Sequence, residues 1–226
     1  MRRGLVSEVF ATAEASARFA DLLGGAPTYL VTERAAKALS DTVTPVGLVA
    51  VCHIPEVALS DVLAGAPRLV AVAVETSEPG NAGTLIRLAD AMGADAMILA
   101  GDGVDPYNGK CLRASAGSIF GLPVLQAPDT RELLSALRDA GLQVLATTLD
   151  GSTALPDADL ARPTAWLFGS EAHGLAPEVS AEADARVSIP MAGSAESLNV
   201  AAAAAICLYQ SALGLRLHGA HSCGEC

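Results

Sequence analysis

Short apolar segments of strand length alternate with segments of helical periodicity along most of this chain, and this alternation constrains the fold more than any other sequence feature. Residues 68–75 form a nearly continuous apolar run, which is typical of a strand buried on both faces. Residues 81–92 follow, with Leu85 and Ala89 at the spacing of a helix that faces a core. Because parallel strands need helical crossovers, the pattern predicts an α/β fold with a mostly parallel sheet flanked by helices.

The same pattern predicts elements along the whole chain. We expect strands at 8–12, 28–32, 47–53, 68–75, 95–100, 142–148, 164–168 and 186–189, and helices at 13–23, 33–40, 81–92, 129–140 and 197–213. Residues 55–67 look like a connector. We therefore predict a small α/β domain at residues 1–62, a larger domain at 66–216 and a C-terminal tail at 217–226.

The composition favours a folded protein of the cytoplasm. Hydrophobic residues make up 51% of the chain and charged residues 17%, which is sufficient for a large core. No apolar run reaches the length of a membrane span, and the N-terminus lacks the apolar core of a signal peptide. We expect a cytoplasmic protein without a membrane partner.

The net charge of −11 argues against nonspecific coating of nucleic acid, because phosphate contacts require Lys and Arg. A local binding site remains compatible with that charge. Lys110 and Arg113 are one helical turn apart beside Ser115, an arrangement that suits a phosphodiester backbone. The alternative for the same three residues is a solvated helix face.

The five cysteines do not predict a metal centre. Cys52, Cys111 and Cys207 lie in apolar or helical surroundings typical of reduced, buried thiols. Cys223 and Cys226 have a spacing that suits zinc or a redox pair. A frayed tail is the commoner state of a chain end, so we predict no metal site.

Three loops gather small and polar residues at the ends of predicted strands. In the first, Pro79 and Gly80 turn the chain, Asn81 suits a helix N-cap, and Arg87 follows within the helix. A helix N-terminus with an Arg suits a phosphate, although an ordinary capped helix with a solvated Arg has the same sequence.

The other two loops are at 166–175 and 189–200. Gly169 and Glu171 follow one strand, and this carboxylate suits the orientation of a hydroxyl or the capping of a short helix. In the second loop, Ser194 or Ser197 suits the N-cap of the last helix. Since open α/β sheets bind ligands beyond the carboxyl ends of their strands, the loops predict one shared site.

The motifs of these loops resemble those of a known family. They are Asn81-x-Gly-x-x-x-Arg87, Phe168-Gly-Ser-Glu-Ala-His-Gly-Leu175 and Ile189-Pro-Met-x-Gly-x-x-x-Ser-Leu-Asn199. In order and spacing they are similar to the three motifs of the SpoU (TrmH-like) RNA ribose 2′-O-methyltransferases, and the resemblance covers residues 68–213.

This resemblance implies a sheet that ends in a trefoil knot, S-adenosyl-L-methionine as cofactor, a homodimer, and structured RNA, ribosomal rather than transfer RNA, as substrate. It assigns catalysis to Arg87, Asn81, Glu171, Ser197 and Asn199, and cofactor binding to Gly169, Ile189, Met191 and Leu198. Arg87 would anchor a phosphate or act as base, although Arg holds its proton in almost every setting.

The chain departs from the family pattern in two places. The second motif reads Ser170-Glu171-Ala172, where the family usually has Asn-Glu-Gly, and fewer residues precede the first motif. We therefore expect a shortened RNA-binding domain at 1–62. The alternative function is a non-catalytic RNA- or cofactor-binding member of the same fold. An unrelated nucleotide-binding hydrolase is disfavoured, because the sequence has neither a phosphate-binding loop nor a nucleophile elbow.

Overall fold

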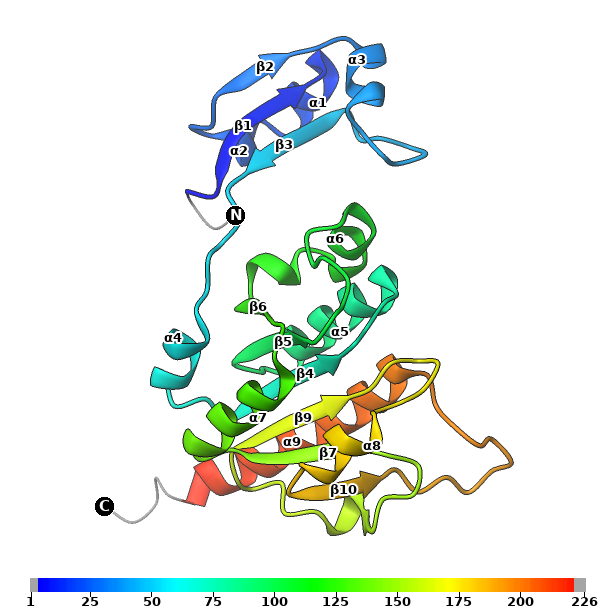
Figure 1. Cartoon of the computed structure of the whole chain (residues 1–226). Helices are drawn as coiled ribbons and strands as arrows, with labels where there is room; N and C mark the ends of the chain where they lie inside the picture. The colour runs from blue at the N-terminus through cyan, green and yellow to red at the C-terminus, as the bar shows by residue number, and fades with distance from the viewer. Residues whose placement is uncertain (1–3, 222–226) are drawn as a thin grey trace. The chain divides into compact units, whose positions relative to one another are not determined.

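The computed structural model describes residues 4–221, and their side chains as far as Arg216 (Figure 1). The chain divides into two compact units, Met1–Glu56 and Val57–Cys226. No helix in the described residues is long and apolar enough to cross a membrane.

The first unit is a three-stranded sheet with short helices. Its strand order is β2-β1-β3, with β2 parallel and β3 antiparallel to the central strand. Val9 and Ala11 of β1 form its small core with Ala15 and Leu23. The elements are β1 (Val6–Ala11), α1 (Ala13–Arg18), α2 (Ala20–Leu23), β2 (Thr28–Leu30), α3 (Glu33–Ala38) and β3 (Leu48–Cys52).

The second unit contains a seven-stranded sheet of order β6-β5-β4-β9-β7-β10-β8, in which every neighbouring pair is parallel. The strands are β4 (Leu69–Val74), β5 (Ala96–Ala100), β6 (Val124–Ala127), β7 (Gln143–Thr147), β8 (Thr153–Ala154), β9 (Thr164–Phe168) and β10 (Ala185–Ser188). The predicted α/β fold with a mostly parallel sheet is confirmed.

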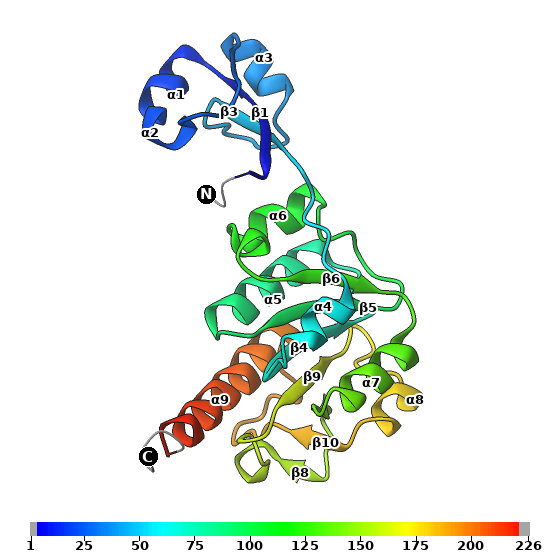
Figure 2. The same ribbon diagram turned by 90° about the vertical axis from the view of Figure 1, so that its left-hand side faces the viewer.

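Helices cover both faces of this sheet (Figure 2). One face carries α5 (Pro79–Ala91), α6 (Gly109–Ser115) and α9 (Val200–His221), and the other carries α4 (Leu59–Ala64), α7 (Thr130–Asp139) and α8 (Pro177–Ala181). Alternate residues of β4 serve the two cores: Leu69 packs toward the first group of helices and Val70 toward the second. Two buried faces explain why this strand is apolar throughout.

Several predicted helix boundaries are wrong. The expected connector at 55–67 contains α4, whose Leu59, Val62 and Leu63 pack on the sheet. The helix expected at 13–23 is interrupted at Phe19. The last helix begins at Val200, not at 197, and runs to His221. Cys223 and Cys226 lie outside the described residues.

A buried hydrogen bond ties α9 to the centre of the sheet. The indole Nε1 of Trp166 in β9 donates to Ser211 Oγ at 2.8 Å. Both side chains are fully buried. Because a buried donor without an acceptor is costly, this bond fixes one register of the helix on the strand.

Ser211→Ala is therefore expected to lower the free energy of unfolding by about 1–3 kcal/mol, since the indole N–H would remain buried without its partner. The measurement is urea denaturation followed by the fluorescence of Trp166, the only tryptophan of the chain. Gln210→Ala, at an exposed neighbouring position, is the control and should change stability little. Equal stability of Ser211→Ala and wild type would contradict this role.

Candidate active site

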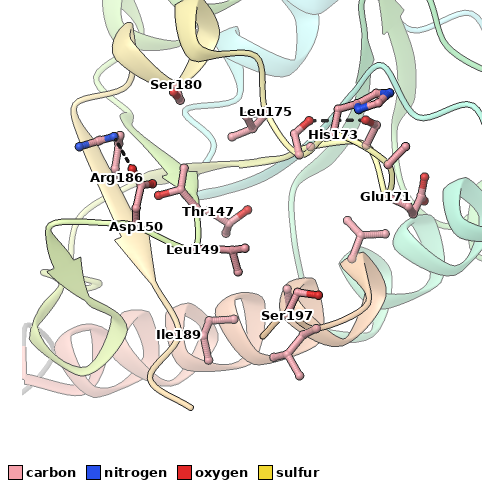
Figure 3. A pocket seen from close by; sticks show the side chains of 18 of the residues that line it. Thr147, Leu149, Asp150, Glu171, His173, Leu175, Ser180, Arg186, Ile189 and Ser197 are labelled. Atoms are coloured by element: carbon pink, nitrogen blue, oxygen red, sulfur yellow. Dashed lines mark hydrogen bonds and ion pairs between the residues drawn. The ribbon is translucent and has the colours of Figure 1, made fainter. Parts of the chain in front are cut away.

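A pocket of about 620 Å³ lies at the carboxyl ends of β7, β9 and β10 and against the start of α9 (Figure 3). This volume is in the usual range for cofactor and substrate sites. The lining residues are Thr147, Thr148, Leu149, Asp150, Gly169, Ser170, Glu171, Ala172, His173, Gly174, Leu175, Pro177, Ser180, Arg186, Ile189, Met191, Ser197, Leu198, Val200 and Ala203.

The loop after β9 is a tight turn that depends on Gly169. Ser170 and Gly174 exchange two backbone hydrogen bonds, of 3.1 and 2.9 Å, which close the loop. A Cβ on Gly169 would approach the carbonyl carbon of Gly174 to 2.1 Å. Ala172 does not have positive φ, so the alanine in place of the family's glycine fits this backbone. The turn presents Glu171 at the pocket.

The loop after β10 supplies a second wall. Ile189, Met191, Ser197 and Leu198 line the pocket, and residues 190–199 are exposed. Asn199 caps α9, because its Oδ1 accepts from Ala201 N at 2.8 Å. The expectation that Ser194 or Ser197 caps this helix is thus wrong. Asn199 lies outside the pocket lining.

The first motif joins the site through one side chain. Asn81 Nδ2 donates a hydrogen bond to Glu171 Oε1, which links α5 to the turn after β9. The sequence suggested Asn81 as the N-cap of α5, and this expectation is wrong. The helix begins two residues earlier, and Glu78 caps it by accepting from Gly80 N at 2.9 Å. Arg87 is exposed on α5, outside the pocket lining.

The three residues predicted to contact RNA have different environments. Arg113 is exposed on α6. Lys110 forms an ion pair with Glu78, with 2.7 Å between Nζ and Oε1. Ser115 is fully buried, and its hydroxyl donates to Leu112 O at 2.8 Å. The Ser115 side chain therefore does not face solvent, and its contact with RNA stays a prediction.

A third wall of the pocket, at residues 147–150, was not predicted from the sequence. Leu149 is 71% exposed, although it is a large apolar residue. Asp150 Oδ2 pairs with Arg186 Nη1 at 3.2 Å (Figure 3). The sequence could have predicted this wall, because the strand expected at 142–148 belongs to the same parallel sheet and its carboxyl end lies at the same edge.

The two buried thiols of the second unit are weakly acidic. Burial raises the pKa of the Cys111 thiol to about 11 and that of Cys207 to about 12, so both are protonated and unreactive at neutral pH. No three His, Cys, Asp or Glu side chains among the described residues are grouped to hold a metal ion. The pocket instead offers backbone groups, apolar side chains, hydroxyls, the imidazole of His173 and two carboxylates, of which Asp150 is paired with Arg186 and Glu171 is not.

An open parallel sheet with such a pocket at its carboxyl edge is typical of α/β proteins that bind a cofactor-sized ligand. Residues 68–209 match the SpoU rRNA Methylase family. The chain belongs to this family, and the resemblance of its motifs is confirmed.

Characterised relatives cover different shares of the chain. It is 35% identical to the 23S rRNA (guanosine(2553)-2′-O)-methyltransferase RlmP of Bacillus subtilis over 206 residues. This match covers 91% of this chain and 80% of that protein. It is 42% identical over 140 residues to the 23S rRNA (uridine(2479)-2′-O)-methyltransferase of Streptomyces viridochromogenes, covering 60% of this chain and 49% of the relative.

Solved structures share the fold. The SpoU methyltransferase AviRb of Streptomyces viridochromogenes, in complex with the cofactor AdoMet, has a TM-score of 0.82 at 32% identity and covers 93% of this chain and 83% of its own. An AdoMet-bound rRNA methyltransferase of Sinorhizobium meliloti also has a TM-score of 0.82 at 32% identity, covering 95% of this chain and 81% of its own.

Gly169→Ala is expected to destabilise the second unit by about 1–3 kcal/mol, because the added Cβ must displace backbone in the turn after β9. Gly193→Ala is the matched control in the other pocket loop, since a Cβ there meets nothing within 4 Å. Thermal unfolding of the two variants measures the difference. Equal midpoints would show that the turn can relax around a side chain.

Proposed function

We propose that this chain transfers the methyl group of S-adenosylmethionine to a ribose 2′-hydroxyl of 23S ribosomal RNA. The main support for the proposal is that residues of all three sequence motifs lie at or beside one pocket. Glu171 and Leu198 line it, and Asn81 is hydrogen-bonded to Glu171. The enzyme class and the cofactor follow from family membership and from the AdoMet-bound neighbours.

The pocket suits this cofactor in size and chemistry. Exposed Leu149, Met191 and Leu198, together with Ile189, offer apolar surface for a purine base and a thioether chain. Figure 3 shows Leu149, Ile189 and Ser197 on the side of the pocket toward α9. When bound, S-adenosylmethionine supplies an electrophilic methyl group, so the protein needs only to hold and orient the acceptor hydroxyl.

The polar residues divide that work. Glu171 has one carboxylate oxygen on Asn81, which leaves the other to accept a hydrogen bond from a ribose hydroxyl. Arg87 and Arg113 are exposed on the paired helices α5 and α6, where they would bind phosphates beside the target ribose. Ser197, in the pocket wall, would position the nucleotide, and Asn199 would fix the loop that carries Ser197 and Leu198.

The first unit is proposed to bind the RNA substrate. Residues 1–56 contain five Lys and Arg and six Asp and Glu, so they account for −1 of the chain's net charge of −11. This unit is therefore the part of the chain that repels phosphate least. Ribosomal RNA as substrate agrees with the substrates named for the relatives in Bacillus and Streptomyces. With that substrate, the protein would act in the cytoplasm.

We also infer the trefoil knot and the homodimer of the family. In support of the knot, the chain leaves β10, near the edge of the sheet, and α9 returns to pack on β4 and β9 at its centre. In support of the dimer, Ile206, Tyr209 and Leu213 form a partly exposed apolar stripe on α9, with 37%, 51% and 37% of their surface accessible.

Calorimetric titration with S-adenosylmethionine and S-adenosylhomocysteine is expected to show saturable one-site binding by the wild type. Leu198→Arg should abolish it, because a long cation would occupy the pocket. Leu39→Arg, at an exposed leucine of α3's C-cap, should bind as the wild type does. Wild-type protein that fails to bind millimolar ligand would favour the non-catalytic alternative.

Arg87→Ala is expected to lower methyl transfer to 23S ribosomal RNA by at least about 100-fold, the usual range for loss of a group that orients the reacting atoms. Cofactor binding should remain, because Arg87 lies outside the pocket. Arg162→Ala, at an exposed Arg preceding the opposite end of β9, is the control. Incorporation of labelled methyl groups measures the rates, and unchanged activity would remove Arg87 from the mechanism.

A further inference from the structure

A series of polar contacts leads from α6 to the proposed active site. Lys110 Nζ lies 2.7 Å from Glu78 Oε1. The same Glu78 oxygen accepts a hydrogen bond from Gly80 N at 2.9 Å and so caps α5. One residue later Asn81 donates to Glu171. Glu78, the N-cap of α5, thus connects Lys110 of α6 to the turn that holds Asn81 against Glu171.

The two helices are too closely packed for the cap to move independently. A Cβ on Gly83 would lie 2.4 Å from Cys111 O and 2.6 Å from Ala114 Cβ, so the backbones of α5 and α6 are in contact at that point. One turn earlier, a Cβ on Gly80 would lie 3.6 Å from Lys110 Cε. A substitution at Lys110 therefore alters the contacts of the first turn of α5.

Lys110 is poorly suited to bind a phosphate directly. Its charge is balanced by Glu78, and an incoming phosphate would have to break this pair. The hydrogen bond from Lys110, followed by that from Gly80 N, lowers the pKa of the Glu78 carboxyl below its usual value. Glu78 is consequently charged at neutral pH.

We propose that Glu78 and Lys110 are positioning residues, which hold the first turn of α5 so that Asn81 reaches Glu171. The inference rests on the proposed methyltransferase function. It replaces the expectation that Lys110 is an RNA contact, and it gives Glu78 a part in the site although Glu78 lies outside the pocket lining.

The test is a double-mutant cycle of Glu78→Gln and Lys110→Met, with kcat, KM for 23S ribosomal RNA and the salt dependence measured for each. Each single variant should lower kcat by up to about 5-fold, the rate equivalent of the strongest exposed ion pairs, because each removes the pair and leaves the cap to Gly80 N in place. KM and its salt dependence should not change. The double variant should be no slower than either single one, because both remove the same interaction. Lys110→Arg, which keeps the pair, should restore the rate.

Arg131→Met is the matched control, because it breaks the exposed ion pair of Arg131 with Glu182, whose 2.8 Å separation is similar, and neither residue lines the pocket or belongs to the series of contacts from α6. It should leave kcat unchanged. If instead Lys110→Met raises KM, weakens its salt dependence and leaves kcat intact, Lys110 binds phosphate and the proposal is wrong. Additive losses in the double variant would also overturn it.

A second readout does not require activity. Hydrogen exchange of the backbone amides at 80–84 and 169–175 should be faster in Glu78→Gln and Lys110→Met than in wild type, and unchanged in Arg131→Met. Exchange that is unchanged in the first two variants would overturn the positioning role. If wild-type protein binds S-adenosylmethionine but methylates no ribosomal RNA, the proposed function fails, while the exchange data still decide the role of Glu78.

Discussion

The parallel hydrogen-bond ladder through β4, β9, β7 and β10 is the constraint on which the rest of the second unit depends. Parallel strands end at the same edge of a sheet, so every loop that leaves a carboxyl end is delivered to one side. Segments about 20 residues apart in sequence, after β7, β9 and β10, thereby form one pocket. The helical crossovers that this ladder requires also cover both faces and exclude water from the strands.

Much of this arrangement can be predicted from the sequence, because the strongest signals come from buried strands. The apolar run of β4 and the glycine, serine and glutamate after β9 identify the sheet and its binding edge. Short elements are harder to predict: β6 has only four residues, one of them Gln126, and α4 has six in a segment bounded by prolines. Their structure depends on packing against the sheet more than on local pattern.

Contacts between residues far apart in sequence are beyond such prediction. The sequence alone predicts that the Lys110 ammonium is free to bind RNA. The close packing of Gly83 against α6 brings Lys110 to Glu78 instead. The caps illustrate the same point. Asn81 and Ser197 have suitable side chains for helix N-caps, but Glu78 and Asn199 take these positions, which leaves Asn81 available to Glu171. Local propensity thus gives the candidates, and tertiary contacts choose among them.

The exposed leucine at position 149 links occupancy of the pocket to the lifetime of the protein. An apolar side chain in contact with water contributes to stability only when a ligand covers it. A ligand that binds only the folded state adds free energy of unfolding that grows with its concentration, about 2.7 kcal/mol at a hundred times its dissociation constant. The supply of methyl donor would then affect how stable the folded protein is, as well as how fast it works.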